Sequence, residues 1–193
     1  MAQTSSTFQL KPGDPAPLFK LCDPIGNWAE NSDFKGKRGL LVMFICNHCP
    51  FVKHIRDPLA KFCSRYQELG IGIVGINSND IEKYPDDSVE KMYEEGVAAG
   101  YTFPYLYDES QNVAQAYGAA CTPDFFLFNE EFKLFYAGQF DSSRPGNDIE
   151  VTGQDLKKAC DSLLDGRPLD FDPTPSVGCN IKWKPGNEPP YFG

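Results

Sequence analysis

One stretch of the chain, residues 40–49, constrains the fold more than any other. Residues 40–45 are six consecutive apolar residues, which is typical of a strand buried on both faces of a sheet. A Cys-Asn-His-Cys motif follows at positions 46–49. Apolar residues then recur three and four apart as far as Leu69, which predicts a helix. The two cysteines therefore lie where a buried strand passes into a helix.

This location favours thiol chemistry. The N-terminal end of a helix presents unpaired backbone N–H groups and the positive end of the helix dipole, and both stabilise an anion. A cysteine placed there loses its proton more readily, and the thiolate is the reactive form. Two intervening residues bring the sulfur atoms within bonding distance. We therefore expect Cys46 and Cys49 to form a redox pair, with Cys46 as the attacking thiol and Cys49 as the resolving thiol.

His48, between the two cysteines, is the third candidate catalytic residue. As an imidazolium it would stabilise a neighbouring thiolate and raise the reduction potential of the pair. The alternatives are a solvated loop histidine, a pair of inert buried thiols, or half of a zinc site. For zinc, which is usually held by four ligands, His48 and His54 are the two histidines that the chain offers. Redox chemistry is favoured over these alternatives, with no metal and no organic cofactor.

Composition narrows the class of protein. A chain of 193 residues is long enough for one domain, residues 1–193, with a substantial core. The net charge of −9 argues against nucleic acid or an anionic membrane as a partner. The N-terminus lacks the basic and apolar regions of a signal peptide, and no segment approaches the ~20 apolar residues of a membrane span, so we expect a cytoplasmic location. The seven cysteines are odd in number and scattered, which indicates thiols and not a disulfide framework.

The rest of the pattern predicts an α/β fold with a mixed central sheet and helices on both faces. Further strands are expected at 18–21, 71–76, 103–107, 125–128 and 134–137, and further helices at 88–98, 113–117 and about 152–164. Thr152, with Asp155 three residues later, is expected to cap the last helix. Residues 1–10 should be loose, and the proline-rich tail at 168–193 should wrap the surface in extended form.

This order of elements, with Thr122-Pro123 leading into the β-hairpin, resembles the thioredoxin superfamily. The segments at 12–19 and 33–37 look like the peroxiredoxin and redoxin branch, and those at 137–146 and 178–184 resemble a peroxiredoxin-like subgroup. The resemblance implies a three-layer sandwich with an N-terminal β extension. It also implies a cis peptide bond before Pro123 and a substrate-binding backbone at Thr122.

The chain departs from both family patterns. Peroxiredoxins place a proline seven residues and a threonine three residues before the peroxide-attacking cysteine. If Cys49 is that cysteine, Val42 and Cys46 hold these positions. The usual activating arginine of the later strand is missing, and Arg144 is the only nearby substitute. Thioredoxins keep a buried carboxylate in the strand before the motif, whereas residues 40–45 have none, so the proton acceptor must be His48, water or another group.

Two more cysteines could take part in redox chemistry. Cys121 lies two residues before Pro123, as a third redox thiol or as a small buried residue. Cys179, in the tail, is either a distant resolving cysteine, as in some peroxiredoxins, or part of the packing of the tail. The remaining cysteines are expected to be buried core thiols: Cys22, Cys63 and Cys160.

The first functional hypothesis is a thiol–disulfide oxidoreductase that acts on protein or small thiol substrates. A thioredoxin or glutathione system would be its reducing partner. The second hypothesis is a thiol peroxidase that reduces hydroperoxides at Cys49. The third is a non-catalytic binding module of the same fold. The resemblance also allows a homodimer, although the sequence shows no interface.

Overall fold

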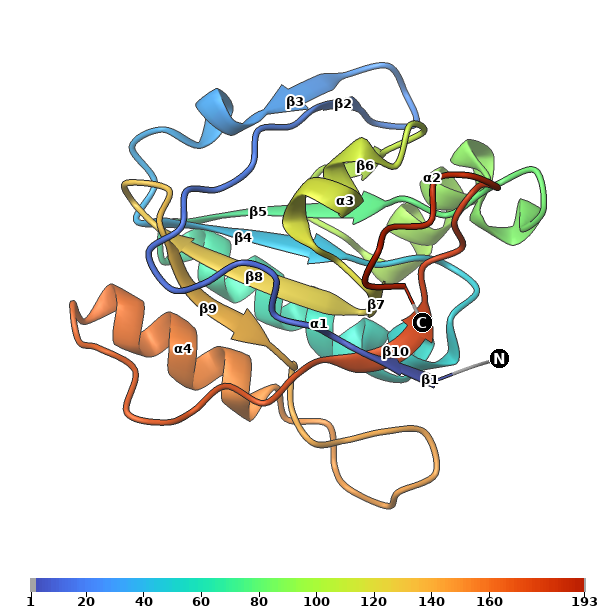
Figure 1. Cartoon of the computed structure of the whole chain (residues 1–193). Coiled ribbons are helices and arrows are strands. Elements are labelled where there is room, and N and C mark those ends of the chain that lie inside the picture. Colours follow the sequence, from blue (N-terminus) through green and yellow to red (C-terminus); the bar gives the residue numbers. More distant parts are fainter. Residues whose placement is uncertain (1–2, 193) are drawn as a thin grey trace.

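A seven-stranded mixed sheet forms the centre of the computed structural model, which describes residues 3–192 (Figure 1). From one edge to the other its strands are β3 (Trp28–Glu30), β2 (Lys20–Cys22), β6 (Tyr105–Tyr107), β5 (Ile71–Asn77), β4 (Gly39–Phe44), β8 (Asp124–Asn129) and β9 (Leu134–Gly138). The central strand β4 pairs in parallel with β5 and antiparallel with β8. The prediction of a mixed sheet is therefore confirmed.

Helices cover both faces of this sheet, as the sequence predicted. They are α1 (Pro50–Glu68), α2 (Val89–Ala99), α3 (Asn112–Tyr117) and α4 (Gln154–Leu164), with short 3-10 helices η1 (Asn31–Phe34) and η2 (Pro85–Asp87). Residues of α1, α2 and α4 pack in one hydrophobic cluster on one face, and residues of α3 pack in a second cluster on the other. Figure 1 shows α1 and α3 on opposite sides of the sheet.

Strand β4 is buried along its whole length because it lies between these two clusters. Successive side chains of a strand point to opposite faces. Leu41 and Met43 accordingly join the cluster of α1, and Leu40, Val42 and Phe44 join the cluster of α3. This arrangement explains the unbroken apolar run, and it fixes the point at which the chain leaves the sheet toward the cysteine motif.

Helix α1 is one continuous helix that contains Pro58 in its interior. Proline lacks the backbone N–H that would continue the helical ladder, so a kink or a second helix capped by Asp57 were both open from sequence. The apolar face that includes Val52, Ile55 and Leu59 is buried. Packing of this face against the sheet outweighs the missing hydrogen bond.

The capping prediction for α4 was wrong. Its N-cap residue is Gly153, with a φ of 65°, and not Thr152. The backbone N–H groups of Thr152 and Gly153 both donate to Asp141 Oδ2, at 2.7 and 2.6 Å. A carboxylate from a distant loop thus binds the start of the helix, and a local sequence pattern cannot reveal such a partner.

The two ends of the described chain form a second, three-stranded sheet of order β1-β10-β7. Its strands are β1 (Gln3–Ser5), β10 (Val177–Asn180) and β7 (Cys121–Thr122). Figure 1 shows the N-terminal and C-terminal strands side by side. The expectation of a loose segment at 1–10 is wrong for Gln3–Ser5, which pair with β10. The tail is extended, as expected, but at β10 it is part of this sheet and Cys179 is buried. Met1 and Ala2 lie outside the described residues.

None of the helices within residues 3–192 is long and apolar enough to cross a membrane.

Candidate active site

Cys46 and Cys49 lie between the end of β4 and the start of α1. Cys49 is the N-cap residue of the helix, and Pro50 is its first residue. Both cysteines are buried, with exposed fractions of 1% and 0%. Any substrate must therefore reach a covered pair of sulfur atoms, and the groups that surround these atoms decide their chemistry.

Hydrogen-bond donors converge on the Cys49 sulfur. Donation from the Cys179 thiol, then from the Cys46 thiol and the Val52 backbone N–H, lowers the pKa of Cys49 well below its ordinary value of 9.0. Burial acts in the opposite direction but does not prevail. The sulfur also lies 3.1 Å from the Thr122 carbonyl oxygen, to which a thiol could donate. Of the two thiols, Cys49 is therefore the one whose ionised form the surrounding donors favour.

Cys46 has the opposite character. Burial raises its pKa well above the ordinary value, and the neighbouring Cys49 and Asp87 raise it further. Its sulfur lies 3.3 Å from Thr122 Oγ1, a contact that favours its ionised form. The sequence predicts Cys46 as the attacking thiol, whereas the directions of the two pKa shifts favour Cys49 as the more acidic thiol; which of the two attacks stays a prediction.

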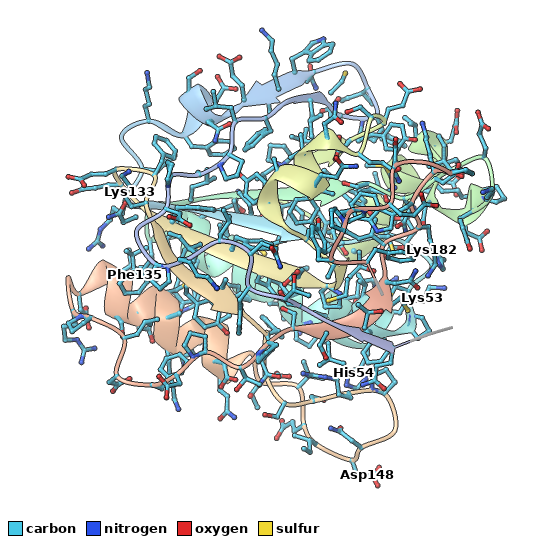
Figure 2. All side chains as sticks on the ribbon, viewed as in Figure 1. Lys53, His54, Lys133, Phe135, Asp148 and Lys182 are labelled. Atoms are coloured by element: carbon cyan, nitrogen blue, oxygen red, sulfur yellow. The ribbon has the colours of Figure 1, made fainter. Side chains whose placement is uncertain are left out.

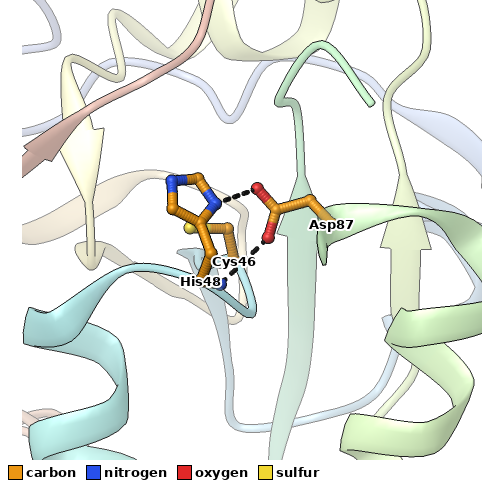
Figure 3. Close-up of side chains that lie close together, drawn as sticks. All are labelled: Cys46, His48 and Asp87. Carbon is orange, nitrogen blue, oxygen red and sulfur yellow. Dashed lines mark hydrogen bonds and ion pairs between the residues drawn. The ribbon is translucent and has the colours of Figure 1, made fainter. Parts of the chain in front are cut away.

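His48 forms a close pair with Asp87 (Figure 3). Its Nδ1 lies 2.5 Å from Asp87 Oδ2, and the other carboxylate oxygen accepts the backbone N–H groups of Asn47 and His48, at 2.8 and 3.1 Å. The His48 ring is mostly buried and stacks on Tyr84, with the ring centres 5.4 Å apart. His48 is therefore held in place, and the alternative of a solvated loop histidine does not describe it.

Asp87 is the functional residue that the sequence analysis missed. It ends η2 and is fully buried, and Asn79 Nδ2 donates to its Oδ2 at 2.7 Å. Asn77, at the end of β5, donates to its backbone oxygen at 2.9 Å. The carboxylate that strand β4 lacks is thus supplied by a segment that follows β5. A pair of aspartates in a polar loop gives no sequence signal that one of them is buried beside the cysteines.

The residues that could hold a metal ion differ from those that the sequence suggested. Cys46, His48 and Asp87 offer one sulfur, one nitrogen and one oxygen within 4.8 Å of one another. His54 does not join them, because its Nε2 lies 2.7 Å from Ser143 Oγ. Structural zinc is held by four protein ligands, and the close His48–Asp87 hydrogen bond would have to open to admit any ion between these groups.

Thr122 and Pro123 lie against the cysteine pair, and the peptide bond between them is cis, as the resemblance implied. Both oxygens of Thr122 contact the pair, its Oγ1 near the Cys46 sulfur and its carbonyl oxygen near the Cys49 sulfur. Cys121 precedes them in the same strand. Its buried thiol lies 3.6 Å from the Pro123 carbonyl oxygen, and burial raises its pKa.

Arg144 is engaged within its own loop. Its guanidinium donates to the carbonyl oxygens of Asp141 and Ser143, at 2.6 and 2.7 Å, and to the side chain of Gln139. Arg144 lines a small hollow together with Pro123 and other residues that flank the cysteine pair, among them Phe51 and Val177. The arginine is thus near the site, but its hydrogen bonds point into its loop and not to the Cys49 sulfur.

The remaining cysteines differ in burial and in their distance from the pair. Cys179, in β10, lies opposite Thr122 and in the same hydrophobic cluster as the pair. Cys63 and Cys160 are fully buried on helices α1 and α4, as predicted, and burial raises the pKa of each. Cys22 is only partly buried in β2. The structure therefore brings one of the two auxiliary candidates, Cys179, into contact with the catalytic pair and places Cys121 beside it.

Comparison with known proteins identifies the class. The fold is the thioredoxin fold, which more distant solved structures of the thioredoxin family share. A family model described as Redoxin matches residues 11–156. The chain belongs to the Redoxin family, which confirms the branch indicated by the sequence.

Individual relatives agree with this family. A protein named thiol-disulfide oxidoreductase ResA, from Halalkalibacterium halodurans, is 29% identical over 63% of this chain and 65% of its own length. A Mycobacterium tuberculosis relative, named as a candidate peroxiredoxin, is 32% identical over 60% of this chain and 68% of its own length. A crystal structure of a hypothetical protein from Sinorhizobium meliloti matches with a TM-score of 0.92 and 50% identity, covering 95% of this chain and 100% of that one. The chain thus spans just under two thirds of the ResA relative.

Proposed function

We propose that the chain catalyses dithiol–disulfide exchange through Cys46 and Cys49. The observation that carries this proposal is the position of the two cysteines at the N-terminus of α1, where both sulfur atoms contact Thr122, at 3.3 and 3.1 Å, beside the cis peptide bond. Thiol and backbone N–H donors around the Cys49 sulfur lower the pKa of Cys49. These donors hold a thiolate beside a second thiol, and thiol–disulfide exchange needs that pair of groups.

In the proposed reaction the Cys49 thiolate attacks one sulfur of a substrate disulfide. A mixed disulfide forms, and the other substrate sulfur leaves as a thiolate. The Cys46 thiol then loses its proton and attacks the Cys49 sulfur, and the second substrate thiolate departs. Two electrons pass from the protein dithiol to the substrate, so the substrate disulfide is reduced and a Cys46–Cys49 disulfide forms.

His48 and Asp87 would serve the second step. Cys46 is protonated in the reduced protein, because burial raises its pKa, and it must lose that proton before it can attack. The His48–Asp87 pair lies beside its sulfur (Figure 3). A carboxylate that holds a histidine in one orientation is a recurrent arrangement for proton transfer. We therefore assign Asp87 the role of the carboxylate that thioredoxins carry in the preceding strand.

The backbone beside the cis bond is not free for an extended protein substrate, so of the protein and small thiol substrates left open by the sequence, a small disulfide requires the smaller opening of the site. An extended substrate chain would pair with the backbone of β7, next to the cis bond. Strand β10 already pairs with Cys121 and Thr122 there. The hollow beside Pro123, Phe51 and Val177 has a volume of about 10 Å³, room for about one water molecule, and neither cysteine lines it, so a small disulfide too must reach the pair through a local opening.

The two alternatives have weaker support. A peroxidase needs donors that polarise the peroxide O–O bond, and the guanidinium of Arg144 is bound to Asp141, Ser143 and Gln139. A non-catalytic module would have no need for a thiolate surrounded by donors. The family implies thiol or peroxide substrates and a redox partner. That this partner is a thioredoxin or glutathione system, that the protein forms a homodimer, and that it is cytoplasmic all stay predictions.

A redox titration tests the proposal. The reduced protein is equilibrated with mixtures of reduced and oxidised dithiothreitol or glutathione, alkylated, and mapped by mass spectrometry. We expect a Cys46–Cys49 disulfide, together with catalysed reduction of oxidised glutathione or insulin that is lost in Cys49→Ser and kept in Cys63→Ala. The absence of this disulfide at every accessible potential would reject the proposal in favour of the binding module.

A further inference from the structure

The C-terminal strand β10 packs directly on the catalytic loop. It pairs antiparallel with β7, so that Cys179 lies opposite Thr122 and Asn180 lies opposite Cys121. Thr122 is the residue whose carbonyl oxygen lies 3.1 Å from the Cys49 sulfur. Residues 46–49 and residue 179, far apart in sequence, therefore meet at one backbone group.

Gly178 makes this contact possible. A Cβ atom at this position would lie 2.0 Å from the Thr122 carbonyl oxygen and 3.1 Å from the Pro123 nitrogen. These are backbone atoms and cannot move aside as the end of a flexible side chain can. The chain has a glycine where β10 crosses the bond between Thr122 and Pro123, and the next residue is a cysteine.

The Cys179 side chain points into the thiol pair. It is 2% exposed and belongs to the hydrophobic cluster that contains Cys46 and Cys49. It lies opposite Thr122, whose carbonyl oxygen contacts the Cys49 sulfur, and a hydrogen bond between the two thiols lowers the pKa of Cys49. Cys49 is therefore adjacent to two thiols, one on either side of it in the sequence and from different elements of the fold.

A buried lysine follows β10 and lies near His48 of the cysteine motif. Lys182 is buried, and its Nζ lies 5.6 Å from the centre of the Tyr84 ring, which stacks on His48. The pKa of Cys179 is raised above its ordinary value, first by its hydrogen bond to Cys49 and then by burial, and the positive charge of Lys182 opposes this shift only in part. Figure 2 shows Lys182 on the side of the molecule where β10 lies, away from Lys133 and Phe135.

We propose that Cys179 is a third exchanging thiol, which forms a disulfide with Cys49 in place of Cys46. This inference rests on the proposed exchange at Cys46 and Cys49. When the Cys46–Cys49 disulfide is present, the Cys179 sulfur attacks Cys49 and gives up its proton. The Cys49–Cys179 bond forms, the Cys46–Cys49 bond breaks, and Cys46 leaves as a thiolate that takes up a proton. The exchange is an isomerisation, so it needs no further oxidant.

The two disulfides would have different consequences. A Cys46–Cys49 disulfide lies within the segment between β4 and α1. A Cys49–Cys179 disulfide joins α1 covalently to the C-terminal strand, and with it to the sheet of β1, β10 and β7. This disulfide would link the tail covalently to the active site, whereas the reduced protein holds it there by backbone pairing and apolar packing alone.

Disulfide mapping of variants in which one cysteine is replaced by serine tests this proposal. Full-length wild type, Cys46→Ser, Cys179→Ser and Cys160→Ser are oxidised with one equivalent of oxidised glutathione or diamide, quenched with acid and an alkylating agent, and mapped by mass spectrometry. We expect both disulfides in the wild type and in Cys160→Ser. Cys46→Ser should give only Cys49–Cys179, and Cys179→Ser should give only Cys46–Cys49. Circular dichroism of each variant checks that it is folded.

The outcomes separate the two proposals. If the wild type forms Cys46–Cys49 and folded Cys46→Ser forms no Cys49–Cys179 disulfide, the third thiol is refuted and the exchange at the pair stands. If the wild type forms neither disulfide, the proposed function fails as well. Should Cys46→Ser fail to fold, the wild type alone decides, because the absence of a Cys49–Cys179 peptide in its digest overturns the inference.

Discussion

Helix α1 carries two cysteines of equal burial and opposite chemistry. Cys49 at its N-terminus and Cys63 in its fourth turn are both 0% exposed, and both belong to the same hydrophobic cluster. Burial raises the pKa of Cys63, whose sulfur has the Met43 sulfur as a neighbour at 3.9 Å. The pKa of Cys49 is lowered, because two thiols and a backbone N–H donate to its sulfur.

This contrast shows that exposure does not identify the reactive thiol. Removal from water disfavours any thiolate, and an apolar surrounding leaves that penalty uncompensated at Cys63. At the start of the helix the unpaired N–H groups and the neighbouring thiols stabilise the thiolate, so the pKa of Cys49 shifts downward and not upward. A covered site of this kind protects the thiolate from bulk reagents, and it requires a local opening for each turnover.

The largest expected effect comes from removing each thiol of this comparison. Cys49→Ser should lower the rate of disulfide exchange by about a thousandfold or more, because no other group can attack the substrate. Cys63→Ala should leave the rate within about twofold and lower the free energy of unfolding by about 1 kcal/mol, through the small cavity that it creates. Rates of glutathione-disulfide reduction and urea unfolding measure both. Equal losses of activity in the two variants would contradict the division between the thiols.

Substitution of the buried carboxylate of Asp87 tests whether the His48–Asp87 pair transfers a proton in the resolving step. Asp87→Asn removes the charge that faces His48 and should slow the resolving step by about a hundredfold. The matched control is Asp86→Asn, since Asp86 is adjacent in sequence but exposed. Single-turnover kinetics across a range of pH give the readout. A proton-transfer role predicts an altered pH profile in Asp87→Asn alone, whereas a purely structural role predicts a slower rate with the wild-type profile.

The sequence could predict the elements of this site better than its contacts. The run from Leu40 to Ile45 and the helical spacing after Cys49 placed the pair correctly, because local periodicity follows from burial of one face. Asp87 and the strand at Cys179 could not be found in this way. The aspartate acts through long-range hydrogen bonds, and β10 is held by backbone pairing with Thr122, for which side-chain patterns carry no signal.

A glycine substitution in β10 tests whether contact with the tail helps to lower the pKa of Cys49. Gly178→Ala pushes a Cβ into the Thr122 carbonyl, so β10 must move away from β7, at a cost of about 1–3 kcal/mol in the free energy of unfolding. Separation of Cys179 from Cys49 should also raise the pKa of Cys49. Thermal unfolding and the pH dependence of alkylation measure these two effects.

The control for this variant is Gly96→Ala. Gly96 lies inside α2, and a Cβ there would have its nearest neighbour at 4.0 Å, in the Tyr101 ring. Alanine in a helix interior is favoured over glycine, so this variant should be more stable by about 0.5–1 kcal/mol and should leave the thiols unchanged. A Gly178→Ala protein as stable as the wild type would show that β10 does not press on the catalytic loop.

The smallest effect, and the most direct comparison of the two thiols, is the pH dependence of stability in the reduced protein. The folded pKa of Cys49 lies below its ordinary value of 9.0, so between these two values the unfolded chain binds more protons than the folded chain. The stability that Cys49 contributes is complete above about pH 9 and is lost as the pH falls through the folded pKa. The difference in unfolding free energy between the wild type and Cys49→Ala should therefore grow with pH, by at most about 1.4 kcal/mol per unit.

Cys63 should show the opposite dependence. Its folded pKa is raised above 9.0, so its contribution is constant below that pH and decreases as the pH rises beyond it. Urea unfolding of the wild type, Cys49→Ala and Cys63→Ala at several values from about pH 6 to about pH 10 measures both slopes. Parallel curves for the two variants would mean that Cys49 is a neutral thiol in the folded protein, since only a thiolate held by donors can make stability rise with pH in this range.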